Sequence, residues 1–337
     1  MSAADRSEAR KPEAAEPEAA EPGAGKPGGG KPEAAGPEAG YASRRPARPP
    51  GVLRSYLRAA RRGRGPSRPQ GPSGTLPPVE LVLPGLTVDR RRLARYVRLC
   101  GGEPGEFLPP AYPHLLAFPA ALALMTAPGF PLPALGLVHI ANTLTRLRPI
   151  RADERLTVRV RTADLRPHPR GTAFDVLAEV SGDTDGDLLW HSAGTYLRRH
   201  PAEPDRPGAV TPPPRPGGVA PPFAEAARWQ LAAGAGRRYA SVSGDRNPIH
   251  LHPWTARPFG FRRAVAHGMW TKARVLEALG PELPAAVRVE VAFRAPVPLP
   301  SEVRLALDRA PDGRSTAFTL TGAADGRTHL RGRAEAL

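Results

Sequence analysis

The sequence predicts an α+β protein made of two similar halves, and three observations support this prediction. Apolar and polar residues alternate in runs such as VRVEVAF (287–293), which is typical of strands in a sheet with one buried face. The same features recur in the same order in residues 85–200 and in the C-terminal part, which indicates a tandem duplication. Apolar residues at helical spacing follow His267 and Gly268.

The strands are expected after a central helix in each half. Alternation or β-branched character marks two runs in the first half and three in the second. These runs are 156–163, 172–182, 287–293, 303–310 and 315–322.

Three matched segments indicate the duplication. The run beginning YVRLCGG at Tyr96 matches YASVSGD at Tyr239, and RLRPIRADERLTVRV (146–160) echoes FRAPVPLPSEVRLAL (293–307). The third pair is GLVHI and AVAHG, residues 136–140 and 264–268.

Composition divides the 337 residues into four segments. Residues 1–74 are rich first in Pro, Ala, Glu and Gly and then in Arg, so we predict a disordered tail whose removal leaves the folded protein intact. Within this tail, 51–62 could form a basic amphipathic helix for an anionic partner, although we favour a solvated linker. Residues 75–199 and 224–337 form the two halves. Residues 200–223, with nine prolines, predict a stiff extended linker.

Charge, cysteine and histidine patterns exclude several classes of protein. Much of the formal net charge of +16 lies outside the predicted folded region, and no zinc pattern or basic aromatic motif accompanies it, so nucleic-acid binding is not expected. The single cysteine, Cys100, excludes an intrachain disulfide, and we expect a buried thiol. With no leader and no apolar span, we expect a cytoplasmic protein. His139, His191 and His252 lack neighbours at metal-ligand spacing, so we predict structural roles and no metal.

The segment from Tyr239 to His267 carries the candidate chemistry. Gly244 allows a sharp bend and Pro248 restricts the residue before it, so Asp245 and His250 should sit on one rigid turn. A carboxylate and an imidazole that converge on one water can act as acid and base in an addition or an elimination. A helix that begins at Gly268 would present unpaired N–H groups to a substrate carbonyl.

The run Tyr239, Val242, Ser243, Gly244, Asp245, Asn247, Pro248, Ile249, His250 and Ala256 closely resembles the hydratase 2 motif of MaoC-like (R)-specific enoyl-thioester hydratases. The resemblance extends through GFRRAVAHGM to about Leu279. It implies a hot dog fold, in which an antiparallel sheet wraps a central helix, and reversible hydration of trans-2-enoyl thioesters. It also implies that Asp245 and His250 are catalytic, that Asn247 is an orienting residue and that the Gly268 N–H is the oxyanion donor.

The first half departs from this motif. Counted from the two tyrosines, Asp245, Asn247 and His250 match Gly102, Pro104 and Phe107, so this half has lost the acid and the base. The pattern resembles double hot dog hydratases, in which an inactive copy shapes the acyl pocket. The apolar run LLAFPAALALM (115–125) would then line the pocket, or it is ordinary core.

The same resemblance implies the partners of the protein. An acyl-CoA or an acyl carrier protein thioester is the substrate, and no separate cofactor is expected, since no Gly-rich phosphate loop follows a predicted strand. Monomer and homodimer are both reasonable. Two alternatives remain, a hot dog thioesterase and a non-catalytic acyl-thioester binding module in which Asp245 and His250 are relics. Considered alone, each residue is most simply explained by a structural role, Asp245 in a turn and His250 in a buried contact.

Overall fold

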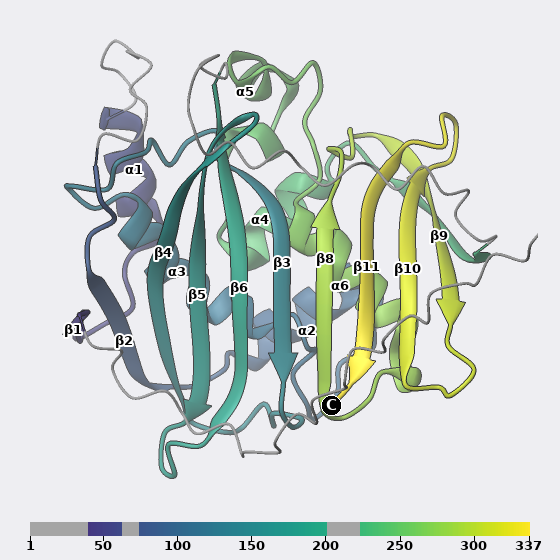
Figure 1. Cartoon of the computed structure of the whole chain (residues 1–337), viewed down its shortest axis with the longest axis horizontal. Helices are drawn as coiled ribbons and strands as arrows, with labels where there is room; N and C mark the ends of the chain where they lie inside the picture. The colour runs from purple at the N-terminus through teal and green to yellow at the C-terminus, as the bar shows by residue number, and fades with distance from the viewer. Residues whose placement is uncertain (1–39, 63–73, 201–222) are drawn as a thin grey trace, which may run out of the picture. The chain divides into compact units, whose positions relative to one another are not determined.

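The computed structural model describes residues 40–62, 74–200 and 223–337. These residues build one 11-stranded sheet with the order β1-β2-β4-β5-β6-β3-β8-β11-β10-β9-β7 (Figure 1). The strands are β1 (Ala42–Arg44), β2 (Val79–Leu86), β3 (Val138–Arg146), β4 (Leu156–His168), β5 (Gly171–Gly182), β6 (Leu188–Arg199), β7 (Ala224–Leu231), β8 (Val287–Phe293), β9 (Ser301–Arg309), β10 (Ser315–Gly322) and β11 (Thr328–Ala336).

The strand order reveals two equivalent halves. When β1 is set aside, β2-β4-β5-β6-β3 mirrors β7-β9-β10-β11-β8, and every neighbouring pair in both sets is antiparallel. We call β2 to β6 with their helices the N-terminal half, and β7 to β11 with theirs the C-terminal half. The halves join at a seam where β3 pairs antiparallel with β8, from Ala141 opposite Ala292 to Arg146 opposite Val287.

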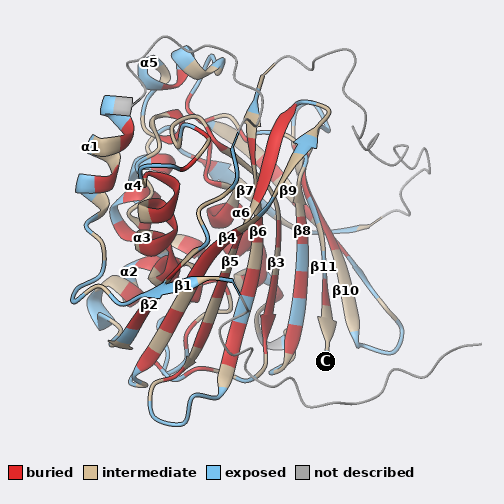
Figure 2. Ribbon diagram, turned by 60° about the vertical axis from the view of Figure 1, so that its left-hand side comes forward, coloured by how far each residue is buried: buried red, intermediate tan, exposed pale blue. Residues whose placement is uncertain are grey.

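The helices lie on one face of the sheet, and strand residues on that face are buried (Figures 1 and 2). In β8, for example, Val287, Val289 and Val291 are buried while the residues between them are exposed, as alternation predicts. The helices and 3-10 turns are α1 (Val52–Arg62), α2 (Arg90–Cys100), α3 (Pro113–Met125), α4 (Ala235–Ser243), η1 (Pro248–His250), α5 (Pro253–Ala256), η2 (Arg257–Phe259), α6 (Gly268–Leu279) and η3 (Gly280–Glu282).

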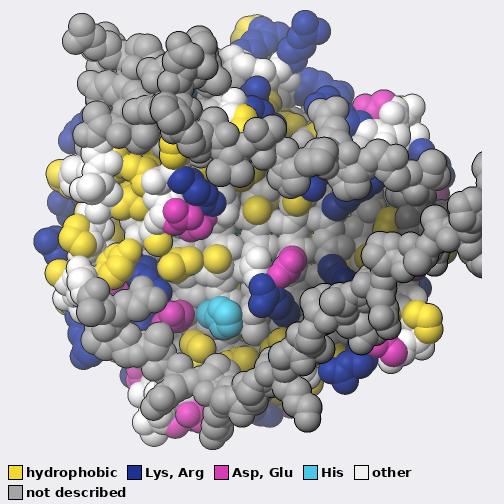
Figure 3. All heavy atoms as spheres, in the orientation of Figure 1, with side chains coloured by type: hydrophobic (Ala, Val, Ile, Leu, Met, Phe, Trp, Pro, Cys, Tyr) yellow, Lys and Arg dark blue, Asp and Glu magenta, His cyan; other side chains and the backbone are white. Residues whose placement is uncertain are grey.

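The opposite face of the sheet carries acidic and basic side chains close together (Figure 3). Ion pairs join neighbouring strands there, such as Arg161 with Glu179 at 3.4 Å and Arg159 with Glu80 at 3.2 Å. The sheet therefore packs apolar side chains against the helices on one face and carries charged side chains on the other, which is the arrangement that the alternating runs predict.

The duplication is visible in the turns as well as in the strand order. The β5–β6 turn and the β10–β11 turn each contain an aspartate, Asp185 or Asp325, whose Oδ1 accepts the N–H of the residue two positions later at 3.1 Å. The glycine that follows each aspartate, Gly186 or Gly326, has a positive φ of 71° or 64°. The same local solution at equivalent places supports an origin by duplication.

The central helices of the two halves are α3 and α6. Helix α3 packs against β2, β4 and β5, and α6 donates a hydrogen bond from Lys272 Nζ to the Val289 carbonyl of β8 at 3.4 Å. The matching of 136–140 with 264–268 is therefore wrong, because 138–146 forms β3 and not the start of a helix. Pro113, at the first turn of α3, starts the N-terminal central helix instead, since proline lacks the N–H that this position leaves unpaired.

The prediction of a disordered tail is wrong for residues 40–62, which we call the N-terminal arm. Strand β1 pairs parallel to β2, and α1 contacts α3. The Tyr41 hydroxyl donates to the Thr162 carbonyl at 3.0 Å. Ser55 and Ala59 are buried, one turn apart on the inner face of α1. The amphipathic helix is thus formed and docks on its own chain through Val52, Ser55, Tyr56 and Ala59, whereas Leu53 and Leu57 are exposed. Residues 1–39, 63–73 and the linker residues 201–222 lie outside the described residues.

The prediction of an α+β double hot dog fold is confirmed, because each half is an antiparallel sheet with a central helix on its buried face. All five predicted strands are present, as β4, β5, β8, β9 and β10. Cys100 is buried, as predicted. Within the described parts of the chain, no helix combines the length and the apolar character required to cross a membrane.

Candidate active site

The turn after α4 holds Asp245 in a fixed position. Gly244 ends the helix with φ +83°, a left-handed conformation that favours glycine, and its N–H donates to the Ala240 carbonyl at 3.0 Å. The Asp245 N–H donates to Ser243 Oγ at 3.1 Å, and the Asn247 N–H donates to Asp245 Oδ1 at 3.1 Å. The turn therefore fixes its own carboxylate, as Gly244 and Pro248 predicted, although Pro248–His250 forms a 3-10 turn rather than plain loop.

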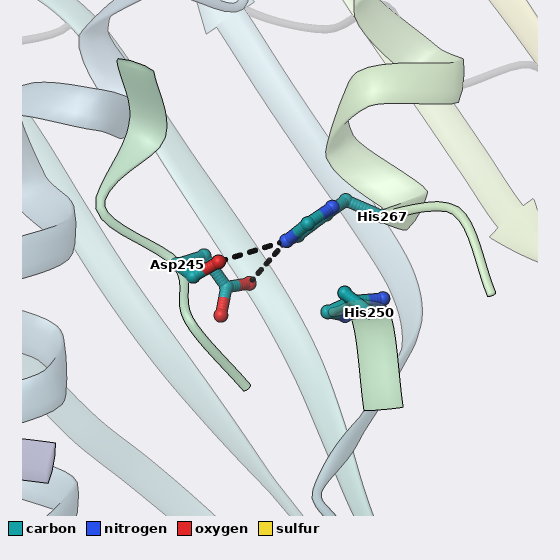
Figure 4. A group of neighbouring side chains, drawn as sticks. All are labelled: Asp245, His250 and His267. Carbon is teal, nitrogen blue, oxygen red and sulfur yellow. Dashed lines mark hydrogen bonds and ion pairs between the residues drawn. The ribbon is translucent and has the colours of Figure 1, made fainter. Parts of the chain in front are cut away.

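Three side chains converge at this turn, namely Asp245, His250 and His267 (Figure 4). One ligand atom from each lies within 4.8 Å of the others. His267 Nε2 donates to the Asp245 main-chain oxygen at 2.9 Å and lies 3.8 Å from Oδ2. The rings of His250 and His267 stack with their centroids 3.7 Å apart. The structure thus brings the predicted pair together and adds His267.

The hydrogen bonds assign the tautomers of both imidazoles. His250 Nδ1 lies 2.8 Å from the Val265 carbonyl, which only accepts, so Nδ1 carries the proton and Nε2 is the acceptor. In His267 the bond to the Asp245 carbonyl requires the proton on Nε2 in the same way. A neutral His250 therefore presents a basic nitrogen, while His267 is a donor to the turn.

Burial sets the charges of the group. Burial lowers the pKa of the His267 imidazole to about 3 and lowers the pKa of His250 below its ordinary 6.5, so both rings are neutral near pH 7. Burial also raises the pKa of the Asp245 carboxyl, but the nearby imidazoles and the hydrogen bonds from Asn247 and Tyr56 lower it further, with a net pKa below its ordinary value. The site therefore holds one carboxylate and one neutral imidazole acceptor.

The same three side chains are close enough to bind a metal ion. Two of the candidate ligand atoms are already engaged, however, since Asp245 Oδ1 accepts from Tyr56 and Asn247, and His267 Nε2 donates to a carbonyl. A metal at this place would have to displace the bond from His267 or use its Nδ1, which is buried and makes no hydrogen bond within the described residues.

Helix α6 begins beside this group. Its N-cap residue, His267, makes no capping bond with its side chain, so the first N–H groups of the helix lack that partner. A Cβ added at Gly268 would lie 3.0 Å from the Phe293 ring, so glycine lets this ring pack closely against the start of the helix. The predicted helix start at Gly268 is confirmed.

Asn247 connects the turn to the N-terminal half. Its Nδ2 donates to the Leu137 carbonyl at 3.3 Å, and its Oδ1 is buried without a hydrogen bond among the described residues. A substrate or water that donates to this oxygen would satisfy it, which fits the predicted orienting role.

All these side chains line one cavity of about 240 Å³. Leu115, Phe118, Leu122 and Met125 of α3 line it, while other residues of the run 115–125, such as Ala120, are buried core. Both interpretations of this apolar run are therefore partly correct. Four arginines also line the cavity, namely Arg170, Arg199, Arg294 and Arg327.

Sequence reasoning missed three further cavity residues. His139, predicted to be structural, and His114 both line the cavity, with ring centroids 6.2 Å apart. Burial lowers the pKa of the His114 imidazole to about 4. Tyr56 reaches the cavity from α1, and its hydroxyl donates to Asp245 Oδ1 at 2.8 Å. The spacing of Val52, Ser55, Tyr56 and Ala59 on one face was the available signal for a docked helix.

The fold and the site define a hot dog protein with a carboxylate and an imidazole at the start of one central helix. Comparison with known proteins agrees with this class. Residues 225–318 match the model of the MaoC like domain. A curated relative, 3-hydroxyacyl-thioester dehydratase X of Mycobacterium tuberculosis, is 36% identical over 281 residues, which is 83% of this chain and 96% of that protein.

The crystal structure of HtdX of Mycobacterium tuberculosis gives a TM-score of 0.67 at 33% identity and covers 77% of this chain and 100% of that one. A 3-hydroxybutyryl-CoA dehydratase of Methylorubrum extorquens is 34% identical over 105 residues, which is 28% of this chain and 66% of that protein. The chain therefore belongs to the MaoC-like dehydratase family.

Proposed function

We propose that this chain is a hydro-lyase that adds water reversibly to trans-2-enoyl thioesters and, in reverse, dehydrates (R)-3-hydroxyacyl thioesters. One observation carries the proposal. The Asp245 carboxylate and the His250 Nε2 acceptor converge beside the start of α6, within a single partly apolar cavity. The names of the similar dehydratases support the same reaction, and the (R) configuration follows from the resemblance of the motif.

The charges of the site suit activation of one water. Because Asp245 is ionised and His250 is neutral, both are acceptors, and a water between them donates one hydrogen to each. As the water oxygen bonds to C3, the C2=C3 π bond opens and one of the two acceptors takes the proton. The same group then returns this proton to C2 on the same face, so the addition is syn and the site regains its charges.

The thioester carbonyl must hold the negative charge that develops when C3 is attacked. We propose that the Gly268 N–H at the start of α6 donates to this oxygen, where a preorganised donor is worth about 10² to 10³ in rate. Dehydration uses the same groups in reverse, since removal of the C2 proton passes through the same enolate-like species.

The remainder of the cavity suits an acyl thioester of CoA or of an acyl carrier protein. The acyl chain would contact the α3 side chains Leu115, Phe118 and Leu122. Four arginines in the cavity wall are complementary to the phosphates that CoA and phosphopantetheine both carry. The thiol group belongs to the substrate, so the reaction needs no separate cofactor.

Hydration of trans-2-enoyl-CoA substrates of several chain lengths tests the proposal. Loss of the conjugated thioester absorbance, with an (R)-3-hydroxy product and no free thiol, is the expected result. It should disappear in Asp245→Asn and in His250→Ala. Release of thiol would instead indicate a thioesterase. No turnover with any CoA or carrier-protein substrate would indicate a non-catalytic acyl-thioester binding module.

A further inference from the structure

Helix α1 of the N-terminal arm lies against the catalytic turn. The Tyr56 hydroxyl donates to Asp245 Oδ1 at 2.8 Å and accepts the Arg246 N–H at 2.9 Å. A Cβ added at Gly244 would lie 3.5 Å from Val52, one turn earlier on the same face of α1. One residue of the arm therefore contacts both the proposed catalytic carboxylate and the backbone next to it.

The arm is held at its other end by the N-terminal half. The Tyr41 hydroxyl bonds to β4, and Ser43 Oγ donates to Glu80 of β2 at 3.1 Å. Because β1 pairs with β2, an anchor on the N-terminal half places Tyr56 of α1 against the turn of the C-terminal half that holds Asp245. Tyr56 is thus positioned by the contacts of the arm with the N-terminal half and by its own contacts with the catalytic turn.

The direction of the hydrogen bond decides what Tyr56 can do. Burial and the neighbouring Asp245 carboxylate raise the pKa of the Tyr56 hydroxyl, so it keeps its proton and donates. Asp245 Oδ1 then accepts two bonds, from Tyr56 and from the Asn247 N–H. Oδ2, which lies 3.8 Å from His267 Nε2, is the oxygen left to face a water.

We propose that Tyr56 is a positioning residue of the active site. Its hydroxyl fixes the rotation of the Asp245 carboxylate and favours the ionised form, so that Oδ2 is the oxygen presented to the substrate water. Residues 40–62 are accordingly part of the enzyme and not a tail. This inference rests on the proposed function, since it assigns a task to Tyr56 in the same reaction.

Other groups also act on Asp245, and a pH test must consider them. They come from every element packed around the turn: His250 of η1, His267 at the start of α6, Tyr239 of α4, His114 of α3, His139 of β3 and Tyr196 of β6. None of these side chains changes in a Tyr56→Phe variant, so a shift between the two proteins reports the hydroxyl.

The test compares Tyr56→Phe with Tyr41→Phe in the full chain. Each variant removes one hydroxyl from the same arm, but Tyr41 bonds to a backbone carbonyl of β4, away from the site. A hydrogen bond to a charged group is worth enough that its loss should lower kcat by about tenfold to a hundredfold. Tyr41→Phe should retain the kcat of the wild type. KM should change less than kcat, because Tyr56 acts on the water-activating group and not on the acyl chain.

The pH profile separates positioning from simple packing. Loss of a donor to the carboxylate raises the pKa of Asp245, so the acidic limb of kcat/KM in Tyr56→Phe should move to higher pH by about one unit. An unchanged limb and an unchanged kcat would overturn the proposal. A fall in kcat with an unshifted limb, equal in both variants, would also overturn it, because it would indicate a general effect on the arm.

A measurement without turnover separates this inference from the proposed function. The 13C resonance of the Asp245 carboxyl, in protein labelled with 13C-aspartate and assigned by its loss in Asp245→Asn, should titrate at higher pH in Tyr56→Phe. If the wild type hydrates no thioester, the proposed function fails. The titration then decides whether Tyr56 affects the pKa of the Asp245 carboxyl, and an unshifted titration would contradict the inference.

Discussion

The two halves of the sheet share a scaffold and differ in the few residues that follow one helix. Helices α2 and α4 both end at a left-handed glycine, Gly101 with φ +89° and Gly244 with φ +83°. Their tyrosines, Tyr96 and Tyr239, are both buried and their rings lie 6.2 Å apart. One position after the glycine, the C-terminal half has Asp245 and the N-terminal half has Gly102. The comparison shows that core residues preserve the fold while a short turn carries the chemistry.

The central helices differ in the same sense. Helix α3 is apolar on all sides, with Pro119 in its interior and no capping bond from its N-cap Tyr112. Helix α6 begins with His267 and Gly268 and buries Lys272. The N-terminal half therefore supplies the apolar α3 wall of the cavity together with His114 and His139, and the C-terminal half supplies Asp245, His250 and His267. Four experiments test this division of roles between the halves.

The largest effect is expected from the turn itself. Asp245→Asn should lower kcat by about 10³ or more, because general acid–base catalysis contributes about 10² to 10⁴ and the amide also loses the charge. The matched position, Phe107, is half exposed and is not among the described residues that line the cavity, so Phe107→His should change kcat by less than about twofold. Steady-state hydration measures both. A similar loss in Phe107→His would mean that the N-terminal turn takes part in the reaction.

The second experiment compares the partly buried His114, which lines the cavity, with an exposed histidine. Burial holds the pKa of His114 at about 4, below the 6.5 of an ordinary histidine, so the unfolded chain binds a proton that the folded chain does not. The neutral His114 therefore stabilises the folded state fully above about pH 6.5. This contribution to the free energy of unfolding, about 3 kcal/mol, is lost as pH falls towards 4. The melting temperature of His114→Phe should therefore fall less on acidification.

His252 provides the control for this effect. It is exposed and caps α5 by accepting the Trp254 N–H, so His252→Ser keeps a capping acceptor and should show the acid sensitivity of the wild type. Melting curves between pH 7 and about pH 4 measure all three proteins. Equal acid sensitivity of His114→Phe and the wild type would contradict the assignment of His114 as a buried neutral group.

The third experiment tests the arm that joins the halves. The prediction that residues 1–74 can be removed without effect is replaced by two unequal truncations. Removal of residues 1–62 should lower kcat by at least about tenfold, because Tyr56 no longer donates to Asp245. Removal of residues 1–39 spares every described contact of the arm and should preserve kcat. Kinetics and thermal melting of both proteins check this, and equal kcat values would show that the arm is dispensable.

The smallest effect concerns the seam. Lys272 is fully buried, burial lowers its pKa well below the ordinary value, and its Nζ donates to Asn142 Oδ1 of β3 at 2.6 Å. Lys272→Met leaves this oxygen without a donor and should reduce the free energy of unfolding by about 1 to 2 kcal/mol. The double variant Lys272→Met/Asn142→Leu should recover part of the loss in urea unfolding, because it removes the stranded acceptor. Strictly additive losses would contradict a direct interaction.

Much of the fold could be predicted from local patterns. The alternation in VRVEVAF reflects one buried face, and the turn at Gly244 and the helix at Gly268 depend on residues adjacent in sequence. The central helix α3 was misplaced, because its apolar run has no helical period to distinguish it from a buried strand. Six of the eleven described strands were missed, among them β6, in which the buried and half-exposed positions do not follow a simple polar alternation.

The part of the candidate site that lies in one short segment was predicted from the sequence. Asp245 and His250 are five positions apart, so their convergence follows from a single turn. Tyr56 lies 189 positions from Asp245, and composition alone assigned it to a tail. His267 was visible as a helix start, but its side-chain bond to the Asp245 carbonyl depends on how the start of α6 meets the turn after α4. Contacts of this kind are tertiary, and no local pattern contains them.

The pairing of β3 with β8 also determines which strands form the edges of the sheet. It uses one edge of each half, so within the described residues the sheet has only two outer strands, β1 and β7. Strand β1 is three residues long, and β7 carries the exposed ion pair of Glu225 with Arg228 at 3.1 Å. Short and charged edges resist pairing with strands of other molecules. Either half alone would instead expose the long backbone edge of β3 or β8, and the fusion therefore protects the protein from aggregation through these strands.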